Sequence, residues 1–322
     1  MDYCVHLNGS DLSFYANKSK TILDAALEKQ LYLSYSCKQG ECGSCSANLL
    51  SGVVKDAVGN LIDSGNILTC CSFPQSNITL DVDFFPELDD INVLNLPCKI
   101  IEIELISDKF YVLKLKLPPH SGFKYLPGQY VNLCLKGVVR SYSLASLDGI
   151  NGVLEFHIKH VPNGQFSQLL ALSQINQLMR LEGPLGTFFI RRSAAPIIFV
   201  AGGTGFAPIQ SMIDKLIQEK SSRFVYFYWR MKCAQDFYSH IPHAWVHENI
   251  KFIPFVSEDD INAVERKGDI DEILKQDFEH LNGYHVYVCG SLSLIQKTKD
   301  VCSHLGLDLK SFFTDAFVSS GD

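Results

Sequence analysis

Four cysteines have the spacing of ligands to an iron-sulfur cluster. Cys37 is followed by Cys42 and Cys45 in the arrangement C-x4-C-x2-C, and Cys70 comes after 24 intervening residues (46–69). Iron-sulfur clusters are held by soft thiolates, and this spacing with a distant fourth cysteine is typical of 2Fe-2S ligands. We therefore expect these four cysteines to be the metal ligands of a 2Fe-2S cluster.

The sequence leaves two alternatives to this ligand set. Cys71 is adjacent to Cys70 and competes with it for the fourth position. A zinc site fits less well, because structural zinc sites favour paired C-x2-C knuckles and the sequence has a single such pair. Gly40 and Gly43 lie between the ligands, where a tight loop needs the positive φ that glycine adopts easily. The remaining cysteines, apart from Cys289, are expected to be small buried side chains.

A glycine-rich turn later in the chain has the composition of a phosphate-binding loop. Gly202, Gly203, Thr204 and Gly205 directly follow an apolar run and precede Pro208. Glycine lets the backbone approach a dinucleotide phosphate, and the N-terminus of a following helix favours the negative charge. The turn is neither a Walker motif nor the G-x-G-x-x-G fingerprint. These residues are nevertheless candidates for nucleotide binding.

Two shorter segments carry groups suited to a pyrophosphate. The segment 140–143 supplies the charged, forked guanidinium of Arg140, the ring face of Tyr142 and the hydroxyl of Ser143. The alternative is that these residues only form the end of a strand. Gly164 and Ser167 open a predicted helix whose N-terminal amides could hold a phosphate. The alternative is that Ser167 only caps that helix.

The elements that position these residues change character along the chain. Residues 1–92 mix short strand-like stretches with one helical candidate, which predicts a small α+β domain. Residues 96–192 alternate with a period of two, as in 112–117, which predicts an antiparallel β-barrel of about six strands. Residues 193–322 repeat strand, turn and helix, which predicts an α/β domain with a parallel sheet. The predicted fold class is therefore multidomain.

Composition excludes several classes of protein. The 322 residues are 47% hydrophobic and 20% charged, which is typical of a globular chain. No apolar run approaches the ~20 residues that a membrane span needs, and no signal-peptide pattern opens the chain, so we expect a cytoplasmic protein.

The negative charge is concentrated in the first domain. Residues 1–92 hold 12 Asp and Glu against 5 Lys, a balance of −7 that equals the net charge of the whole chain. The negative electrostatic field of this domain disfavours binding to nucleic acid and to anionic membranes, and it steers the domain toward a basic surface of a partner protein. The alternative is an acidic face that binds no partner.

The cysteine segments 34–45 and 67–74 resemble the plant-type ferredoxin domain, and the later motifs resemble a ferredoxin-NADP reductase. Together the two resemblances cover essentially the whole chain. They imply a β-grasp-like ferredoxin domain (1–92), an FAD domain (96–192) and an NAD(P)H domain (193–322). The ferredoxin pattern before Phe73 and Pro74 favours Cys70 over Cys71.

The reductase resemblance implies roles for the flavin residues. Arg140 would take the FAD pyrophosphate, Tyr142 would pack on the flavin and Ser143 would lie near its reactive N5 atom. Phe317, in the closing segment of the chain, would shield the flavin, although a Phe at that place is also consistent with plain core packing.

The same resemblance implies a nicotinamide site. The segment 202–208 would bind the nucleotide, and Cys289 with Gly290 would lie beside the nicotinamide, so that Ser143 and Cys289 are the implied catalytic residues. Asp236 favours NADH, although Arg230 leaves NADPH possible. A flavin can take a hydride and release single electrons, whereas a 2Fe-2S cluster carries one electron. Electrons would thus pass from NAD(P)H to FAD and then to the cluster.

The segments 67–71, 83–88, 97–98, 137–143 and 181–189 resemble the CDP-6-deoxy-Δ3,4-glucoseen reductases. That resemblance implies a redox partner, the pyridoxamine-phosphate (PMP)-dependent CDP-4-keto-6-deoxyglucose-3-dehydrase of 3,6-dideoxyhexose (O-antigen) biosynthesis, docking on the acidic ferredoxin domain. The same architecture serves reductase components of oxygenases, which leaves an oxygenase component as an alternative partner. A non-catalytic redox sensor is a further alternative, which the intact nicotinamide segment disfavours.

Overall fold

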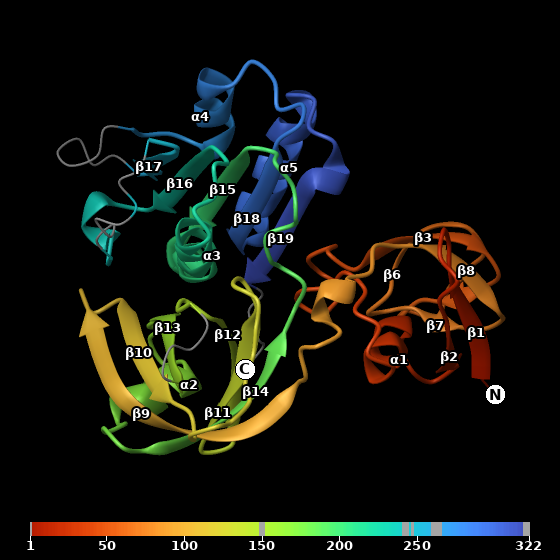
Figure 1. The fold of residues 1–322 in the computed structure, drawn as a ribbon, viewed down its shortest axis with the longest axis horizontal. Coiled ribbons are helices and arrows are strands. Elements are labelled where there is room, and N and C mark those ends of the chain that lie inside the picture. The colour runs from red at the N-terminus through yellow and green to blue at the C-terminus, as the bar shows by residue number, and fades with distance from the viewer. Residues whose placement is uncertain (1, 148–151, 240–244, 246–247, 259–265, 318–322) are drawn as a thin grey trace. The chain divides into compact units, whose positions relative to one another are not determined.

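The chain folds into two compact units. The structure is a computed structural model that describes residues 2–147, 152–239, 245, 248–258 and 266–317 (Figure 1). Residues 1–91 and 186–188 form one unit, called here the N-terminal unit, and residues 92–185 and 189–322 form the C-terminal unit. The three domain boundaries expected from the sequence stay predictions, and the observed division differs from them in placing 186–188 with the N-terminal unit.

The N-terminal unit is an α+β fold with a mixed sheet. Its five-stranded sheet has the order β2-β1-β8-β3-β6, in which β1 is antiparallel to β2 and parallel to β8, and a small sheet has the order β5-β4-β7. The strands are β1 (Asp2–Leu7), β2 (Ser13–Asn17), β3 (Ser46–Ser51), β4 (Val54–Lys55), β5 (Leu61–Ile62), β6 (Gly65–Leu68), β7 (Phe73–Pro74) and β8 (Ile78–Asp81). A short 3-10 helix, η1 (Pro86–Leu88), follows them.

Helix α1 (Ile22–Glu28) supplies the apolar cover of this sheet. Its first turn is stabilised by Thr21, whose side chain accepts a hydrogen bond from the backbone N–H of Asp24. The buried face of the helix and the strands form one hydrophobic core with Val5, Leu7 and Leu80. The faces that pack there follow from the spacing of apolar residues at 22, 23, 25 and 26.

The first sheet of the C-terminal unit is six-stranded and antiparallel. Its order is β12-β11-β14-β9-β10-β13. The alternation predicted for 112–117 is confirmed, since Leu113, Leu115 and Leu117 are buried. After β12, the N–H of Ala145 donates to the carbonyl of Glu155 on β13 at 2.9 Å, so the two outer strands approach each other. The elements are β9 (Leu94–Ile106), β10 (Phe110–Lys116), β11 (Tyr130–Leu135), β12 (Val138–Ser143), β13 (Val153–Lys159), α2 (Gln165–Ala171) and β14 (Leu178–Leu185).

The second sheet of the C-terminal unit is parallel, as predicted (Figure 1). Its order, β17-β16-β15-β18-β19, changes direction between β15 and β18. The ends of these two strands therefore form the topological switch point, where open α/β sheets bind ligands. The elements are β15 (Ile197–Gly202), η3 (Gly203–Gly205), α3 (Phe206–Gln218), β16 (Val225–Met231), η4 (Ala234–Asp236), β17 (Ile250–Val256), α4 (Ile270–Asp277), β18 (His285–Ser291), α5 (Leu292–His304), η6 (Leu309–Ser311) and β19 (Phe312–Phe317).

Within the described part of the chain, no helix is both long enough and apolar enough to cross a bilayer. The cytoplasmic location expected from the sequence stays a prediction.

Candidate cluster site and candidate active site

The cluster loop turns on the two glycines that the sequence singled out. Gly40 has φ +77° and Gly43 has φ +72°, in the left-handed region that glycine adopts without strain. A Cβ atom at Gly40 would lie 2.7 Å from the Sγ of Cys71. The loop therefore needs glycine at position 40 both for its conformation and for space.

The four predicted ligands lie in two pairs within the N-terminal unit. Cys45 Sγ and Cys70 Sγ are 3.2 Å apart, and Cys37 shares a hydrogen bond with Cys42. Among the residues that the structure describes, no three side chains of Cys, His, Asp or Glu are arranged so that they could hold one metal ion. A binuclear cluster takes two thiolates for each iron, whereas a zinc ion collects four donors. The paired thiols fit a 2Fe-2S cluster better than zinc.

Cys71 lies beside these pairs. Its Sγ is 3.5 Å from Cys70 Sγ, whereas Cys70 Sγ is the atom paired with Cys45. This geometry supports Cys70 as the fourth ligand. The prediction that the remaining cysteines are buried is correct for Cys98 and Cys302 and wrong for four partly exposed ones: Cys4, Cys71, Cys134 and Cys233.

In each pair, a hydrogen bond between the two cysteines lowers the pKa of one thiol. A hydrogen bond with Cys42, helped by the backbone N–H of Gln39 and opposed by burial, lowers the pKa of Cys37 to about 5. The hydrogen bond with Cys70, also opposed by burial, lowers the pKa of Cys45 to about 7. Because thiolate is the form that ligates iron, these hydrogen bonds favour the ligating form of one thiol in each pair.

The predicted nucleotide loop lies at the switch point of the parallel sheet. Gly202 ends β15, and the 3-10 helix Gly203–Gly205 leads into α3, which carries Pro208. A Cβ atom at Gly205 would lie 2.2 Å from the carbonyl oxygen of Cys289, so the turn after β15 is packed backbone to backbone against the end of β18. Gly290 is likewise close, because its Cβ would lie 3.2 Å from the Gly202 nitrogen. The structure thus brings 202–205 together with Cys289 and Gly290.

Ser143 and Cys289, the two implied catalytic residues, meet at a buried carboxylate. The Ser143 hydroxyl donates to Asp315 Oδ2 at 3.1 Å, and the Cys289 thiol donates to the same oxygen at 3.8 Å. All three side chains are buried. Burial, together with the charge of Asp315, raises the pKa of Cys289 well above its usual range, so the thiol is neutral at physiological pH. Asp315 therefore orients one group from β12 and one from β18.

Asp315 is a candidate site residue that the sequence analysis did not single out. It lies in β19, in the closing segment 312–317 where the sequence singled out Phe317 instead. Phe317 is 39% exposed at the end of the same strand, so the structure does not place it in the core. An isolated acidic residue in an aromatic segment was the available signal, and its partner Ser143 is 172 residues away.

The predicted flavin residues share strand β12 and the helix near it. Arg140 and Tyr142 lie two residues apart and so face the same side of the strand, whereas Ser143 faces the other. Tyr142 packs on Phe166 of α2 with ring centroids 5.2 Å apart, and burial raises its pKa above the usual range.

The start of α2 differs in detail from the sequence prediction. Gly164 occupies the N-cap position without a side-chain cap, and Ser167 lies in the first turn. The Ser167 hydroxyl accepts a hydrogen bond from the backbone N–H of Val161 at 3.0 Å, so it fixes the chain before the helix instead of capping the helix. A phosphate-binding role for this turn stays a prediction.

Of the two residues expected to select between NADH and NADPH, Asp236 has a partner that the sequence did not predict. Asp236 is buried in η4 and forms an ion pair with Lys109, which precedes β10 of the antiparallel sheet. Arg230 is half-buried near the end of β16. The pairing with Lys109 gives Asp236 a role in joining the two sheets of this unit, and its role in nucleotide choice stays a prediction.

A second buried polar contact joins the same two sheets and was not predicted. His157 of β13 approaches Glu155 at 3.0 Å and the hydroxyl of Tyr238 at 3.2 Å, so both ring nitrogens have partners. Tyr238 stacks on Phe110 with centroids 4.4 Å apart. These contacts hold the segment after β16 against the antiparallel sheet near the candidate active site.

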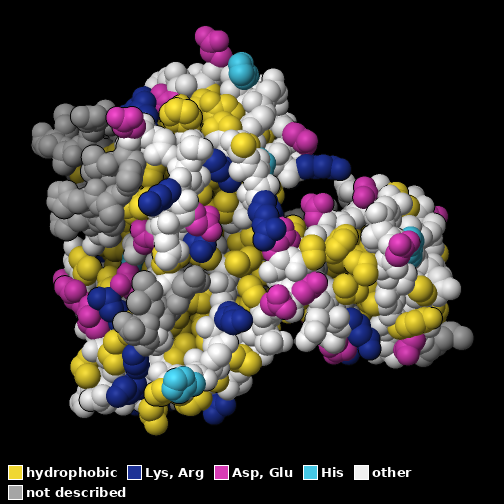
Figure 2. All heavy atoms as spheres, in the orientation of Figure 1, with side chains coloured by type: hydrophobic (Ala, Val, Ile, Leu, Met, Phe, Trp, Pro, Cys, Tyr) yellow, Lys and Arg dark blue, Asp and Glu magenta, His cyan; other side chains and the backbone are white. Residues whose placement is uncertain are grey.

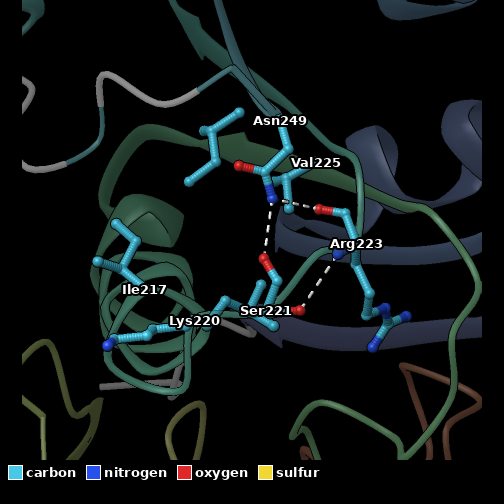
Figure 3. Close-up of a pocket in the computed structure, with 8 residues that line it drawn as sticks. Ile217, Lys220, Ser221, Arg223, Val225 and Asn249 are labelled. Carbon is cyan, nitrogen blue, oxygen red and sulfur yellow. Dashed lines mark hydrogen bonds between the residues drawn. The ribbon is translucent and has the colours of Figure 1, made fainter.

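A surface pocket elsewhere in the C-terminal unit does not belong to this site. Lys220, Ser221 and Asn249 line it at the edge where β16 and β17 begin (Figure 3). Asn249 closes it by donating to the carbonyls of Ser221 at 3.0 Å and Arg223 at 2.8 Å (Figure 3). Ligands of parallel sheets bind at the opposite edge, beyond the carboxyl ends of the strands.

Comparison with known families defines the class of protein. Three family models match in the order that the sequence implies: a 2Fe-2S iron-sulfur cluster binding domain at residues 5–75, an oxidoreductase FAD-binding domain at 97–190 and an oxidoreductase NAD-binding domain at 199–300. The chain is therefore an oxidoreductase with domains for a 2Fe-2S cluster, FAD and a nicotinamide nucleotide. The multidomain fold class and the three cofactors expected from the sequence are confirmed.

Full-length relatives narrow this class to a family. The chain is 44% identical over 326 residues to protein RfbI of Salmonella typhimurium, with 100% of this chain and 98% of the relative covered. It is 42% identical over 328 residues to CDP-6-deoxy-L-threo-D-glycero-4-hexulose-3-dehydrase reductase of Yersinia pestis, covering 99% and 100%. The chain belongs to the family of these dehydrase reductases, in agreement with the resemblance found in its sequence.

Solved structures support the fold. The Amycolatopsis cytochrome P450 reductase GcoB matches with a TM-score of 0.77 at 22% identity, covering 99% of this chain and 100% of that one. At that identity the likeness concerns the architecture alone.

Proposed function

We propose that this protein carries electrons from NADH through FAD and a 2Fe-2S cluster to the dehydrase that acts on a CDP-6-deoxy-4-hexulose. The observation that carries the proposal is the full-length match at 42% identity to a reductase named for that dehydrase. When bound, FAD supplies the conversion of a two-electron hydride into single electrons, and the cluster accepts one electron at a time. The redox-sensor alternative has no specific observation in its favour.

The residues of this chain hold the reacting groups and exclude water. Ser143, Cys289 and Asp315 form a buried site at the switch point, with a neutral thiol and a hydroxyl fixed by one carboxylate. Groups that are held in place and shielded from water can orient a hydride donor and acceptor, because these groups need not reorganise before the reaction. Asp315 would thus position Ser143 and Cys289, the proposed catalytic residues.

Arg140 is the proposed anchor of the FAD pyrophosphate. Arg140→Ala is expected to purify with FAD depleted roughly tenfold or more, because a charge-assisted hydrogen bond to phosphate contributes about 1.5–3 kcal/mol. The measurement is the flavin-to-protein ratio of the purified variant. Arg180→Ala is a matched control, since its guanidinium binds Asn95 on the same sheet. Stoichiometric flavin in Arg140→Ala would assign the pyrophosphate to another residue.

The partner is proposed to dock on the N-terminal unit. Residues 1–92 carry the whole negative balance of the chain, and on the face shown in Figure 2 acidic side chains are distributed over this unit. Such a surface attracts a basic face of a partner and gives a salt-dependent association rate.

A coupled assay, in which the reductase supplies electrons to a candidate partner protein, tests the identity of the partner. With NADH, this chain is expected to support turnover by a CDP-6-deoxy-4-hexulose dehydrase, and the rate at limiting reductase should fall as ionic strength rises. An oxygenase component in place of the dehydrase is the control. Turnover with the oxygenase component and none with the dehydrase would reject the proposed partner and restore the oxygenase alternative.

A further inference from the structure

Trp229 of β16 lies against the turn 202–205, called here the nucleotide loop. In the parallel sheet Trp229 pairs with Ala201, so it stands on the neighbouring strand at the point where β15 passes into the loop. Its indole N–H donates to the carbonyl oxygen of Gly203 at 3.0 Å. The same oxygen accepts a hydrogen bond from the backbone N–H of Phe206, the first residue of α3. Two donors, one from the next strand and one from the following helix, therefore fix this carbonyl.

Aromatic rings hold the indole in this orientation. Trp229 is 1% exposed and stacks on Phe206 with ring centroids 4.2 Å apart. Phe237 and Tyr238 pack against it edge to face, with centroids 4.9 Å and 5.4 Å from that of Trp229. Both arrangements are ones that aromatic pairs prefer, and a closely packed side chain cannot change rotamer without disturbing its neighbours. The indole N–H is thus directed at the nucleotide loop by the packing around it.

The hydrogen bond from Trp229 sets the direction of the peptide unit between Gly203 and Thr204. In a planar trans peptide the C=O and N–H groups point in opposite directions. Because the Gly203 carbonyl points to the buried indole, the N–H of Thr204 points away from it. Gly203 has φ +57°, and a Cβ atom there would meet no described atom within 4 Å, so the loop borders open space at this residue. An anion beside such a loop is favoured by N–H groups and repelled by carbonyl oxygens.

We propose that Trp229 is a positioning residue that holds the nucleotide loop in the form that binds the pyrophosphate of a nicotinamide dinucleotide. The indole keeps one carbonyl oxygen turned toward the core and fixes the peptide unit that follows it. This role concerns the affinity for the nucleotide, whereas Asp315 is proposed to position the groups beside the reacting atoms. The inference rests on the proposed function, in which a nicotinamide dinucleotide is the electron donor.

Trp229→Phe tests this role, because it keeps an aromatic ring and removes the N–H. The dissociation constant for NADH is expected to rise roughly fivefold, which is the effect of losing one typical hydrogen bond. Anaerobic stopped-flow over a range of NADH concentrations gives this constant and the limiting rate of flavin reduction, which should stay within about twofold of the unaltered chain. ADP-ribose has the pyrophosphate but no nicotinamide, and its affinity, measured by calorimetry, should fall by the same factor.

Trp245→Phe is the matched control, since the chain has two tryptophans and both contact Phe206. The ring of Trp245 lies 5.9 Å from that of Phe206, and its indole N–H donates to Asp214 of α3 at 2.7 Å instead of to the loop. This variant should leave both dissociation constants unchanged. It thereby separates the loss of the hydrogen bond to Gly203 from the loss of an indole beside Phe206.

A second replacement of Trp229 serves if phenylalanine disturbs the packing enough to deplete the flavin. 3-Benzothienylalanine has the shape of tryptophan with a sulfur atom in place of the N–H, and it should weaken both nucleotides as phenylalanine does. Flavin-loaded variants that bind NADH and ADP-ribose within twofold of the unaltered chain would reject the role of Trp229, as would an equal loss of affinity in Trp245→Phe. If the unaltered chain binds neither nucleotide, the proposed function itself is wrong.

Discussion

Cys42→Ser is expected to yield a flavoprotein that has lost its iron and acid-labile sulfide. Cys42 is one thiol of the Cys37 pair, and a serine hydroxyl is a hard donor that does not replace a thiolate on iron. Iron and sulfide should fall below roughly a tenth of the amount in the unaltered chain, because one of the four thiolates that hold the cluster is then missing. Reduction of ferricyanide by NADH should continue, since the flavin and nucleotide residues lie in the C-terminal unit.

The matched control for this variant is Cys71→Ser. Cys71 is the thiol next to Cys70 that is outside the two pairs, so its loss should leave the iron content unchanged. Full iron in Cys42→Ser would overturn the ligand assignment. Loss of iron in Cys71→Ser with retention in Cys70→Ser would show that Cys71 is the fourth ligand.

Asp315→Ala is expected to slow hydride transfer from NADH to the flavin about 100-fold, because misplaced reacting groups lose rate on that scale. The carboxylate fixes both the Ser143 hydroxyl and the Cys289 thiol, and without it neither side chain keeps its orientation. The loss should fall mainly on kcat, since the proposed role of Asp315 is to position the Ser143 hydroxyl and the Cys289 thiol, which its carboxylate contacts. Anaerobic stopped-flow bleaching of the flavin band measures the step.

Two variants serve as controls for Asp315→Ala. Asp315→Asn keeps an oxygen acceptor at nearly the same place and should lose less activity than the alanine variant. Asp300→Ala removes an exposed carboxylate from α5 and should have no effect. Flavin content shows whether the fold is intact. A flavin-loaded Asp315→Ala that reacts within twofold of the unaltered chain would remove Asp315 from the mechanism.

Features defined by neighbouring residues were predictable from the sequence. The loop 37–45 carries three ligands and two glycines within nine positions, and its conformation depends on little beyond itself. The turn 202–205 likewise follows from an apolar strand, glycines and a helix in succession. In both places the chemistry is local, so spacing alone identified the residues.

Features that depend on distant residues were not predictable. Asp315 meets Ser143 only because β19 packs next to β18 while β12 belongs to the other sheet of the unit, and no pattern within 312–317 encodes that. Asp236 was singled out for nucleotide choice, and its partner Lys109 is 127 residues away. The four hydrogen bonds between Tyr35 and the segment 186–188 join residues 151 or 152 positions apart, so no local pattern predicts them.

Anaerobic titration of the freshly purified protein with NADH, and separately with NADPH, tests the electron route most directly. Visible absorbance follows the flavin and the iron-sulfur bands, and electron paramagnetic resonance follows the cluster. We predict that NADH bleaches both bands and produces the signal of a reduced 2Fe-2S cluster. Flavin bleaching with an iron-sulfur band that does not change, or a protein without an iron-sulfur band, would contradict the route from nicotinamide through flavin to the cluster.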